Sequence, residues 1–164
     1  MKTLLVVRHA KSSWEDPTVD DHERPLNARG ERDAPRMGRR VRETRLSIEL
    51  IISSDALRAR LTAQAIADAT GHRGQILLDP RLYHASVADI LAVLRSALED
   101  NVATAMLVGH NPGLEELVAQ LTGEPEDLPT AALAQIALPI DSWRDLTTST
   151  RGTLVRLWRP KELE

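Results

Sequence analysis

The feature that most constrains the fold is a regular alternation of short apolar runs with longer segments of helical period. Short runs rich in Val, Leu and Ile predict buried strands, and in this chain they are Leu4–Val7, Leu50–Ile52, Ile76–Leu78, Ala105–Val108, Leu133–Leu138 and Thr153–Trp158. Strands that alternate with helices through short connections predict a three-layer α/β/α sandwich around a mostly parallel sheet. We see no repeat or linker, so residues 1–164 are expected to form a single domain.

Capping residues predict where the helices begin and end. The predicted helices run from Asn27 to about Thr44, from Ser54 or Asp55 to Ala69 with Gly71 closing it, from Val87 to Leu98, and from Asn111 to Gly123. Pro35 should kink the first helix or delay its regular part, and Pro112 should occupy the first position of the last one. The polar segment Lys11–Pro25 and the Thr- and Ser-rich stretch before Thr153 are expected to be loops.

Composition excludes several classes of function. The chain has no cysteine, which rules out disulfides, thiolate metal sites and cysteine nucleophiles. A net charge of -3 gives no overall attraction to nucleic acid or to an anionic membrane. No apolar stretch approaches the ~20 residues that a membrane span needs, and no signal-peptide pattern is seen, so a cytoplasmic location is expected. Seven arginines between Arg29 and Arg45 are interleaved with acids, which favours a solvated helix face over an anion-binding surface.

Histidines and arginines gather at the predicted carboxyl ends of the strands. Arg8 and His9 end the first strand, and His110 follows the fourth. Arg58 lies one turn into the helix after the second strand, and His84 follows the third. Ligand sites of parallel α/β sheets lie at this edge, where strands lead into helices. We therefore expect these side chains to share one site.

The residue types at this edge suit an oxyanion. The planar fork of an arginine holds phosphate oxygens in pairs and stays charged at physiological pH. A neutral histidine can attack phosphorus directly, or act as an acid or base near pH 7. A competing use of His9, His84 and His110 is a metal site, but the spacing lacks a His-Glu-x-x-His pattern and the arginines would repel a cation. For the segment Gly109–Gly113, an alternative to any ligand site is a simple turn that leads into a well-capped helix.

Four segments together resemble a known family. Leu5–Ala10 resembles the Arg-His-Gly signature of the histidine phosphatase superfamily, which has the phosphoglycerate mutase-like fold. Ser54–Ala63 resembles its S-x-x-x-R-A-x-x-T-A segment, and Val108–Asn111 resembles its second histidine motif. Arg24–Gly30 is similar to its helix entry after the first loop. The short chain and Ala10 in place of glycine resemble the SixA-type phosphohistidine phosphatase branch.

The resemblance implies a role for each matching residue. His9 would be the nucleophile and become transiently phosphorylated, and Arg8 and Arg58 would clamp the phosphoryl oxygens. His110 would complete the pocket and stabilise charge in the transition state, with Asn111 as a further substrate-binding residue. Lys11 would lie at the rim. Neither a metal nor a cofactor is implied.

One departure from the family bears on the substrate. Larger members carry a Glu or Asp that protonates the leaving oxygen, whereas the comparable stretch here, Arg81–His84, has no carboxylate. His84 is a candidate acid or a rim residue, and Asp79 and Glu15 are weaker candidates. Imidazole leaves far more easily than an alkoxide, since its conjugate acid has a pKa of roughly 6.5. The sequence therefore predicts a metal-independent phosphatase for protein phosphohistidine. The alternatives are a phosphatase of small phosphomonoesters and a non-catalytic phosphate-binding module.

Overall fold

The computed structural model describes residues 1–163, and over that range the chain forms one six-stranded sheet in the order β3-β2-β4-β1-β5-β6. The strands are β1 (Lys2–Arg8), β2 (Leu50–Ser53), β3 (Ile76–Leu78), β4 (Thr104–Gly109), β5 (Leu133–Leu138) and β6 (Thr153–Trp158). β1 to β4 run parallel, β5 is antiparallel to β1, and β6 is antiparallel to β5. All six predicted strands are confirmed, within two residues at each end.

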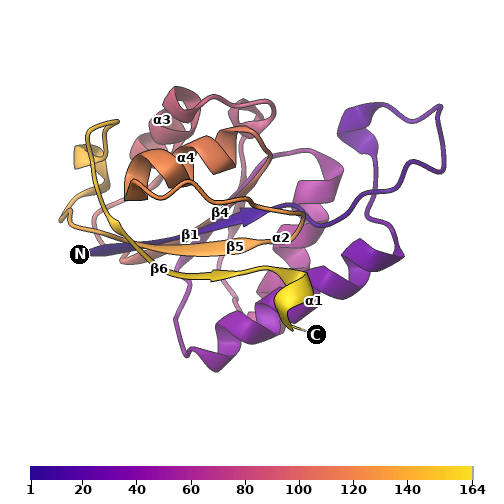
Figure 1. Cartoon of the computed structure of the whole chain (residues 1–164), viewed down its shortest axis with the longest axis horizontal. Helices are drawn as coiled ribbons and strands as arrows, with labels where there is room; N and C mark the ends of the chain where they lie inside the picture. The colour runs from indigo at the N-terminus through magenta and orange to yellow at the C-terminus, as the bar shows by residue number, and fades with distance from the viewer. Residues whose placement is uncertain (164) are drawn as a thin grey trace.

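Helices cover both faces of the sheet and make three layers (Figure 1). α1 (Ala28–Glu43) and α2 (Leu57–Thr70) pack on one face, and α3 (Val87–Ala97) and α4 (Gly113–Thr122) pack on the other. Side chains alternate along a strand, so Leu5 and Val7 of β1 join the core under α1 and α2, while Leu4 and Val6 join the core under α3 and α4. The predicted three-layer α/β/α fold with a mostly parallel sheet is confirmed.

Several predicted helix ends are also confirmed. The side chain of Asn27 accepts a hydrogen bond from the Gly30 amide and caps α1. Gly71 and Gly123 end α2 and α4 in the left-handed conformation that glycine adopts without strain. α1 runs without interruption from Ala28 through Pro35, so the proline does not delay the regular part of the helix.

The predicted starts of α2 and α4 are wrong. α2 begins at Leu57 without a side-chain cap, and α4 begins at Gly113 with Pro112 just before it. The side chain of Ser54 instead forms a hydrogen bond with His110, and that of Asp55 forms one with His22. The side-chain amide of Asn111 donates to the Leu128 carbonyl. These polar groups serve tertiary contacts at the sheet edge, so they are not available as caps.

The segment between β5 and β6 is not simply an exposed loop. Trp143 lies in a short 3₁₀ turn and is fully buried, with its indole N–H donating to the Val102 carbonyl at 2.8 Å. On α1, Arg29, Arg32 and Arg36 pair with the buried carboxylate of Asp33, which fits the interpretation of the arginine-rich stretch as a helix face. Within residues 1–163 no helix has the length and apolarity to cross a bilayer.

Candidate active site

A pocket of about 280 Å³ opens at the edge of the sheet where the parallel strands end. Apart from the weaker acid candidates Asp79 and Glu15, every residue predicted for the site lines it, and the full lining is Arg8, His9, Lys11, Ser12, Trp14, Arg24, Arg58, His84, His110, Asn111 and Thr130. A larger hollow of about 390 Å³ lies between the carboxyl ends of α1 and α2, at the opposite edge. We assign the active site to the smaller pocket because the histidine pair and the clustered arginines are there.

Strand register brings the two central histidines together. β1 and β4 are adjacent parallel strands with Arg8 opposite Gly109, so the next residues, His9 and His110, emerge side by side. Their ring centroids are 5.1 Å apart. The amide of Ala10 donates to the Thr62 hydroxyl of α2 at 2.9 Å, which fixes the backbone just after His9.

His9 has the protonation state of a nucleophile. Its Nδ1 lies 2.8 Å from the Ala10 carbonyl. A carbonyl only accepts, so Nδ1 carries the hydrogen and Nε2 carries the lone pair. Burial lowers the pKa of His9 to about 4, and the nearby Arg58 and Arg8 add to the shift. The ring is therefore neutral at pH 7.

His110 is neutral as well but is oriented differently. Burial, with His9 and Arg58 as further causes, lowers its pKa to about 3. Its Nε2 lies 2.8 Å from the Ser54 hydroxyl, which already accepts from the Ala56 amide. The Ser54 hydroxyl hydrogen is thus available to His110 Nε2. A hydroxyl can also accept a second hydrogen bond, so the tautomer is an assignment: we place the ring hydrogen of His110 on Nδ1, a buried atom with no partner among residues 1–163.

Three arginines line the pocket, one more than predicted. Arg8 donates to the Leu128 carbonyl at 3.0 Å, and burial lowers its pKa. Arg58 donates from Nη1 to the Asp21 carbonyl at 2.7 Å and from Nη2 to the Asp21 carboxylate at 3.1 Å. Arg24 donates from Nε to the same carboxylate at 3.1 Å. Over the described part of the chain, Arg8 Nε, Arg58 Nε and Arg24 Nη1 are buried without a hydrogen-bond partner.

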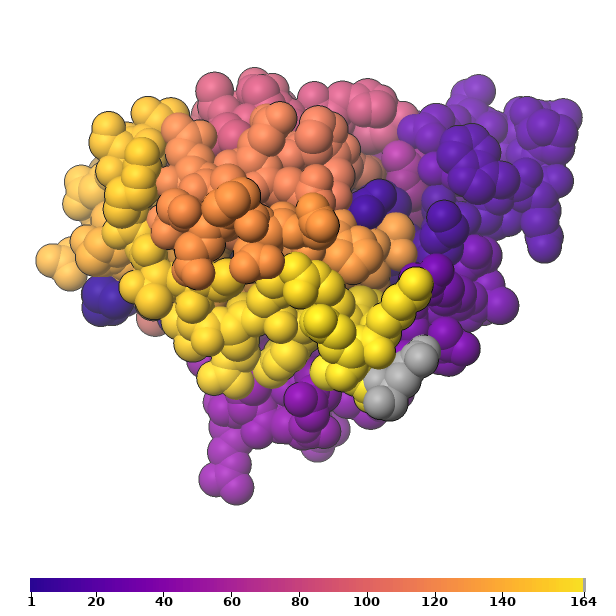
Figure 2. Space-filling view, in the orientation of Figure 1, coloured from indigo at the N-terminus to yellow at the C-terminus, as the bar shows by residue number. Residues whose placement is uncertain are grey.

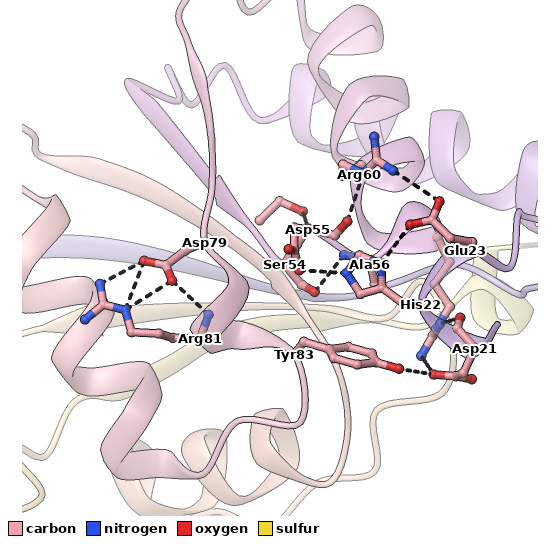
Figure 3. A network of polar contacts seen from close by, with 12 residues as sticks. Asp21, His22, Glu23, Ser54, Asp55, Ala56, Arg60, Asp79, Arg81 and Tyr83 are labelled. Carbon is pink, nitrogen blue, oxygen red and sulfur yellow. Dashed lines mark hydrogen bonds and ion pairs between the residues drawn. The ribbon is translucent and has the colours of Figure 1, made fainter.

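Asp21 organises this side of the pocket, and sequence reasoning missed it together with Arg24. Its carboxylate also accepts from the Tyr83 hydroxyl (Figure 3), and that bond is the main reason why the pKa of Asp21 falls to about 2. Arg24 could have been predicted as a site residue, because it lies in the Arg24–Gly30 segment that resembles the family. That segment was interpreted only as the entry to the first helix. Asp21 begins a short 3₁₀ turn (Asp21–Glu23) inside a polar segment without periodicity, so nothing in the sequence singled it out.

The loop that carries Asp21 is tied to α2 by a second set of contacts. His22 lies 2.9 Å from both Asp55 and Glu23, and Arg60 pairs with Glu23 at 3.8 Å (Figure 3). The hydrogen bond to Asp55, then the one to Glu23, raises the pKa of His22. In the space-filling view the loop forms a lobe at the upper right, beyond the end of β1 (Figure 2). These contacts hold the loop against the pocket.

The candidate acids have different surroundings. His84 lines the pocket with its ring centroid 3.9 Å from that of Tyr83, and its backbone φ of 56° is in the left-handed region. Asp79 lies outside the pocket, where it is paired with Arg81 (Figure 3), and that hydrogen bond lowers its pKa. Glu15 is exposed and is not part of the lining. Of the three, the structure brings only His84 to the site.

The arrangement suits a phosphoryl group held by arginines next to a neutral imidazole. Preorganised cationic donors stabilise the charge that spreads over the phosphoryl oxygens during transfer. Residues 1–163 contain no group of three His, Asp or Glu side chains placed to hold a metal ion.

Comparisons with known proteins bear on the family and the fold of the chain. The sequence profile of the histidine phosphatase superfamily (branch 1) matches residues 4–90. An uncharacterized chloroplastic protein of Arabidopsis thaliana is 30% identical over 152 residues, which is 88% of this chain and 70% of that protein. The structure of the protein histidine phosphatase SixA in complex with tungstate superimposes with a TM-score of 0.84, at 25% identity and 99% coverage of both chains.

A second solved structure gives a similar result. It is a protein of Agrobacterium tumefaciens assigned provisionally as the phosphohistidine phosphatase SixA. The TM-score is 0.82 at 28% identity, covering 97% of this chain and 98% of that one.

Proposed function

The chain belongs to the histidine phosphatase superfamily and is a phosphatase, and we propose that it removes phosphate from protein phosphohistidine through a phosphohistidine intermediate on His9. One observation carries the proposal. A neutral imidazole with a free Nε2 lies in a pocket lined by three arginines, and within residues 1–163 no carboxylate belongs to that lining.

In the first step, His9 Nε2 attacks phosphorus. A bond forms between Nε2 and phosphorus while the bond from phosphorus to the substrate nitrogen breaks, and its electron pair leaves with that nitrogen. Arg8 and Arg58 hold the phosphoryl oxygens with their remaining N–H groups, and Arg24 is a third donor. His110, with its ring hydrogen on Nδ1, donates to one oxygen and stabilises the charge that develops there. Asn111 and Lys11 complete the binding surface at the rim.

The leaving group decides whether an acid is needed. A phosphorylated imidazole takes a proton on its other ring nitrogen from solvent, so it departs as a neutral imidazole, whose conjugate acid has a pKa of roughly 6.5. An alkoxide requires a proton donor in the site. Asp21 is ionised at neutral pH because its pKa is about 2, so it cannot donate that proton. A site with this composition favours a phosphoramidate over an alkyl phosphate.

In the second step, water attacks the phosphorus of phospho-His9. The bond from Nε2 to phosphorus breaks, the electron pair returns to Nε2, and orthophosphate leaves. Because the pKa of His9 is about 4, the displaced imidazole stays neutral and the proton lost by water goes to the phosphate product or to solvent. The enzyme is then ready for another turnover without a metal or cofactor.

A second candidate function is hydrolysis of small phosphomonoesters. His84 favours it, because a histidine at the mouth of the pocket could protonate an alkoxide. The two functions predict different effects of His84→Ala. For a monoesterase the variant loses most of its turnover, whereas hydrolysis of phosphohistidine is nearly unchanged.

The test is a substrate panel with a chemical readout of the intermediate. We expect a higher kcat/KM on a phosphohistidine peptide than on alkyl phosphates, and acid-labile label on wild-type protein after a rapid quench. His9→Ala should lose both turnover and label. His72→Asn is the matched control, because that histidine lies at the opposite edge of the sheet. Tight phosphate binding without any label would indicate a binding module, and full activity of His9→Ala would refute the proposal.

A further inference from the structure

Trp14 is a large aromatic side chain that the fold leaves exposed at the rim of the catalytic pocket. The chain has three Trp, one Tyr and no Phe, so aromatic rings are scarce. Trp143 is fully buried, whereas Trp14 is 70% exposed and belongs to the pocket lining. A single exposed hydrophobic side chain is ordinary on a protein surface, but Trp14 lies in the lining of the pocket, where a ligand can contact it.

The indole is held in place although it is exposed. Ser12 forms an antiparallel bridge with Leu26, and the Ser13 amide donates to the Pro25 carbonyl at 2.8 Å, so the backbone leading to Trp14 is fixed. One face of the indole covers the guanidinium of Arg24, whose Cζ lies 3.4 Å from the ring centroid. This cation–π contact orients the ring and leaves its other face open.

The same contacts connect the indole to the phosphate-binding arginines. Arg24 and Arg58 share the carboxylate of Asp21, so the three side chains form one continuous assembly. Arg24 lines the pocket directly below the indole. His9 is buried at the base of the pocket and Trp14 is exposed at its rim, so in-line attack by His9 directs the leaving group outward, toward the side that carries Trp14.

We propose that Trp14 is a specificity-determining residue, which stacks its open face on the imidazole ring of the substrate phosphohistidine. This inference rests on the proposed function, since it concerns the leaving group of that same reaction. Stacked aromatic rings attract each other beyond the burial of their surfaces. A flat phosphorylated ring gains this contact, and a phosphoramidate without a ring does not.

A matched pair of substrates isolates the ring. N-phosphoimidazole and inorganic phosphoramidate both contain a P–N bond, and only the first carries an aromatic ring. We expect Trp14→Ala to raise KM for N-phosphoimidazole about tenfold more than it raises KM for phosphoramidate, in line with a stacking contact that only the first substrate can make. Trp14→Phe keeps a ring and should stay within about threefold of wild type on both substrates. Thermal melting checks that each variant is folded.

Each other outcome overturns the inference. An equal rise in KM for both substrates would mean that Trp14 acts only through Arg24. An unchanged KM for both would mean that Trp14 has no role in binding the substrate. A wild-type enzyme that hydrolyses phosphoramidate through labelled His9 but not N-phosphoimidazole would refute the proposed substrate together with this contact. If wild type hydrolyses both substrates and Trp14→Ala does not separate them, the proposed function stands and the role of Trp14 fails.

Discussion

Replacement of Arg58 by lysine tests the electrostatic design of the pocket most directly. Arg58 has five N–H bonds in a planar fork. Two of them point to Asp21, one to its carbonyl and one to its carboxylate, and Nε is buried without a partner over residues 1–163. The remaining N–H groups are those we assign to the phosphoryl oxygens. Lysine keeps the charge but has a single ammonium, which cannot satisfy Asp21 and hold two oxygens in one plane.

The expected loss follows from the bonds that lysine cannot replace. One hydrogen bond that involves a charged group contributes about 1.5–3 kcal/mol, and about 1.36 kcal/mol corresponds to a tenfold change in rate. Loss of one such bond to the phosphoryl group should lower kcat/KM by roughly 10- to 150-fold, and loss of two should lower it further. Because the clamp tightens as charge develops, we expect most of the loss in kcat.

The assay is steady-state hydrolysis of N-phosphoimidazole, together with the rate of His9 labelling after a rapid quench. Arg60→Lys is the matched control: Arg60 lies two residues further along α2 and outside the pocket, where it bonds the Asp55 carbonyl and pairs with Glu23 at 3.8 Å, and lysine keeps the charge of that pair. That variant should stay within about twofold of wild type, as is usual for a surface substitution. Wild-type kinetics for Arg58→Lys would refute the clamp, and an equal loss in both variants would show that any change on this helix is harmful.

Two further predictions concern titration and packing. An NMR pH titration of the five imidazoles should place the midpoint of His9 near pH 4 and that of His110 near pH 3, so that both are neutral at pH 7, while His22 should titrate above its ordinary value. Midpoints near pH 6.5 for His9 and His110 would contradict the neutral form that we assign to the nucleophile His9. Gly30→Ala should lower the urea midpoint by the equivalent of about 1–3 kcal/mol, although alanine usually stabilises a helix interior, because the new Cβ would overlap the Lys11 carbonyl. A more stable variant would show that this close approach can relax.

The sequence predicted the strands, and it predicted that Arg8, His9 and His110 lie together, because both depend on local patterns. Buried strands need continuous apolar runs, and the carboxyl end of a parallel strand is where Arg8, His9 and His110 had to lie. The predicted caps of α2 and α4 were wrong because the prediction used local patterns alone. Ser54 and Asn111 have cap-forming side chains, but tertiary partners compete for the same atoms, and those partners are distant in sequence.

The loop residues could not be predicted in the same way. Asp21 and Arg24 acquire their role from contacts with Arg58 and with each other, across a segment that has neither period nor strand ladder. Trp14 is exposed, and its position depends on the same loop. A single sequence shows which residue types are present in such a segment, but their partners are set by the path of the loop.

Burial is the main reason why the histidines of the pocket are neutral, and the charges around them add to that effect and indicate which ligand the pocket suits. Arg8, Arg24, Arg58 and Lys11 line the pocket as cations. Two anions offset part of this charge: Asp21 bonds two of the arginines, and Glu115 acts on Arg8 from behind.

Four cations and two anions leave a net charge of two positive units, which is equal in magnitude and opposite in sign to the charge of a phosphoryl dianion. A proton on His9 would add a third cation to a buried site, and that cost is the physical reason why its pKa falls. A carboxylate ligand would leave one cation uncompensated, whereas a phosphoryl group neutralises the pocket as it binds, so this balance of charge selects the phosphoryl group before any chemistry begins.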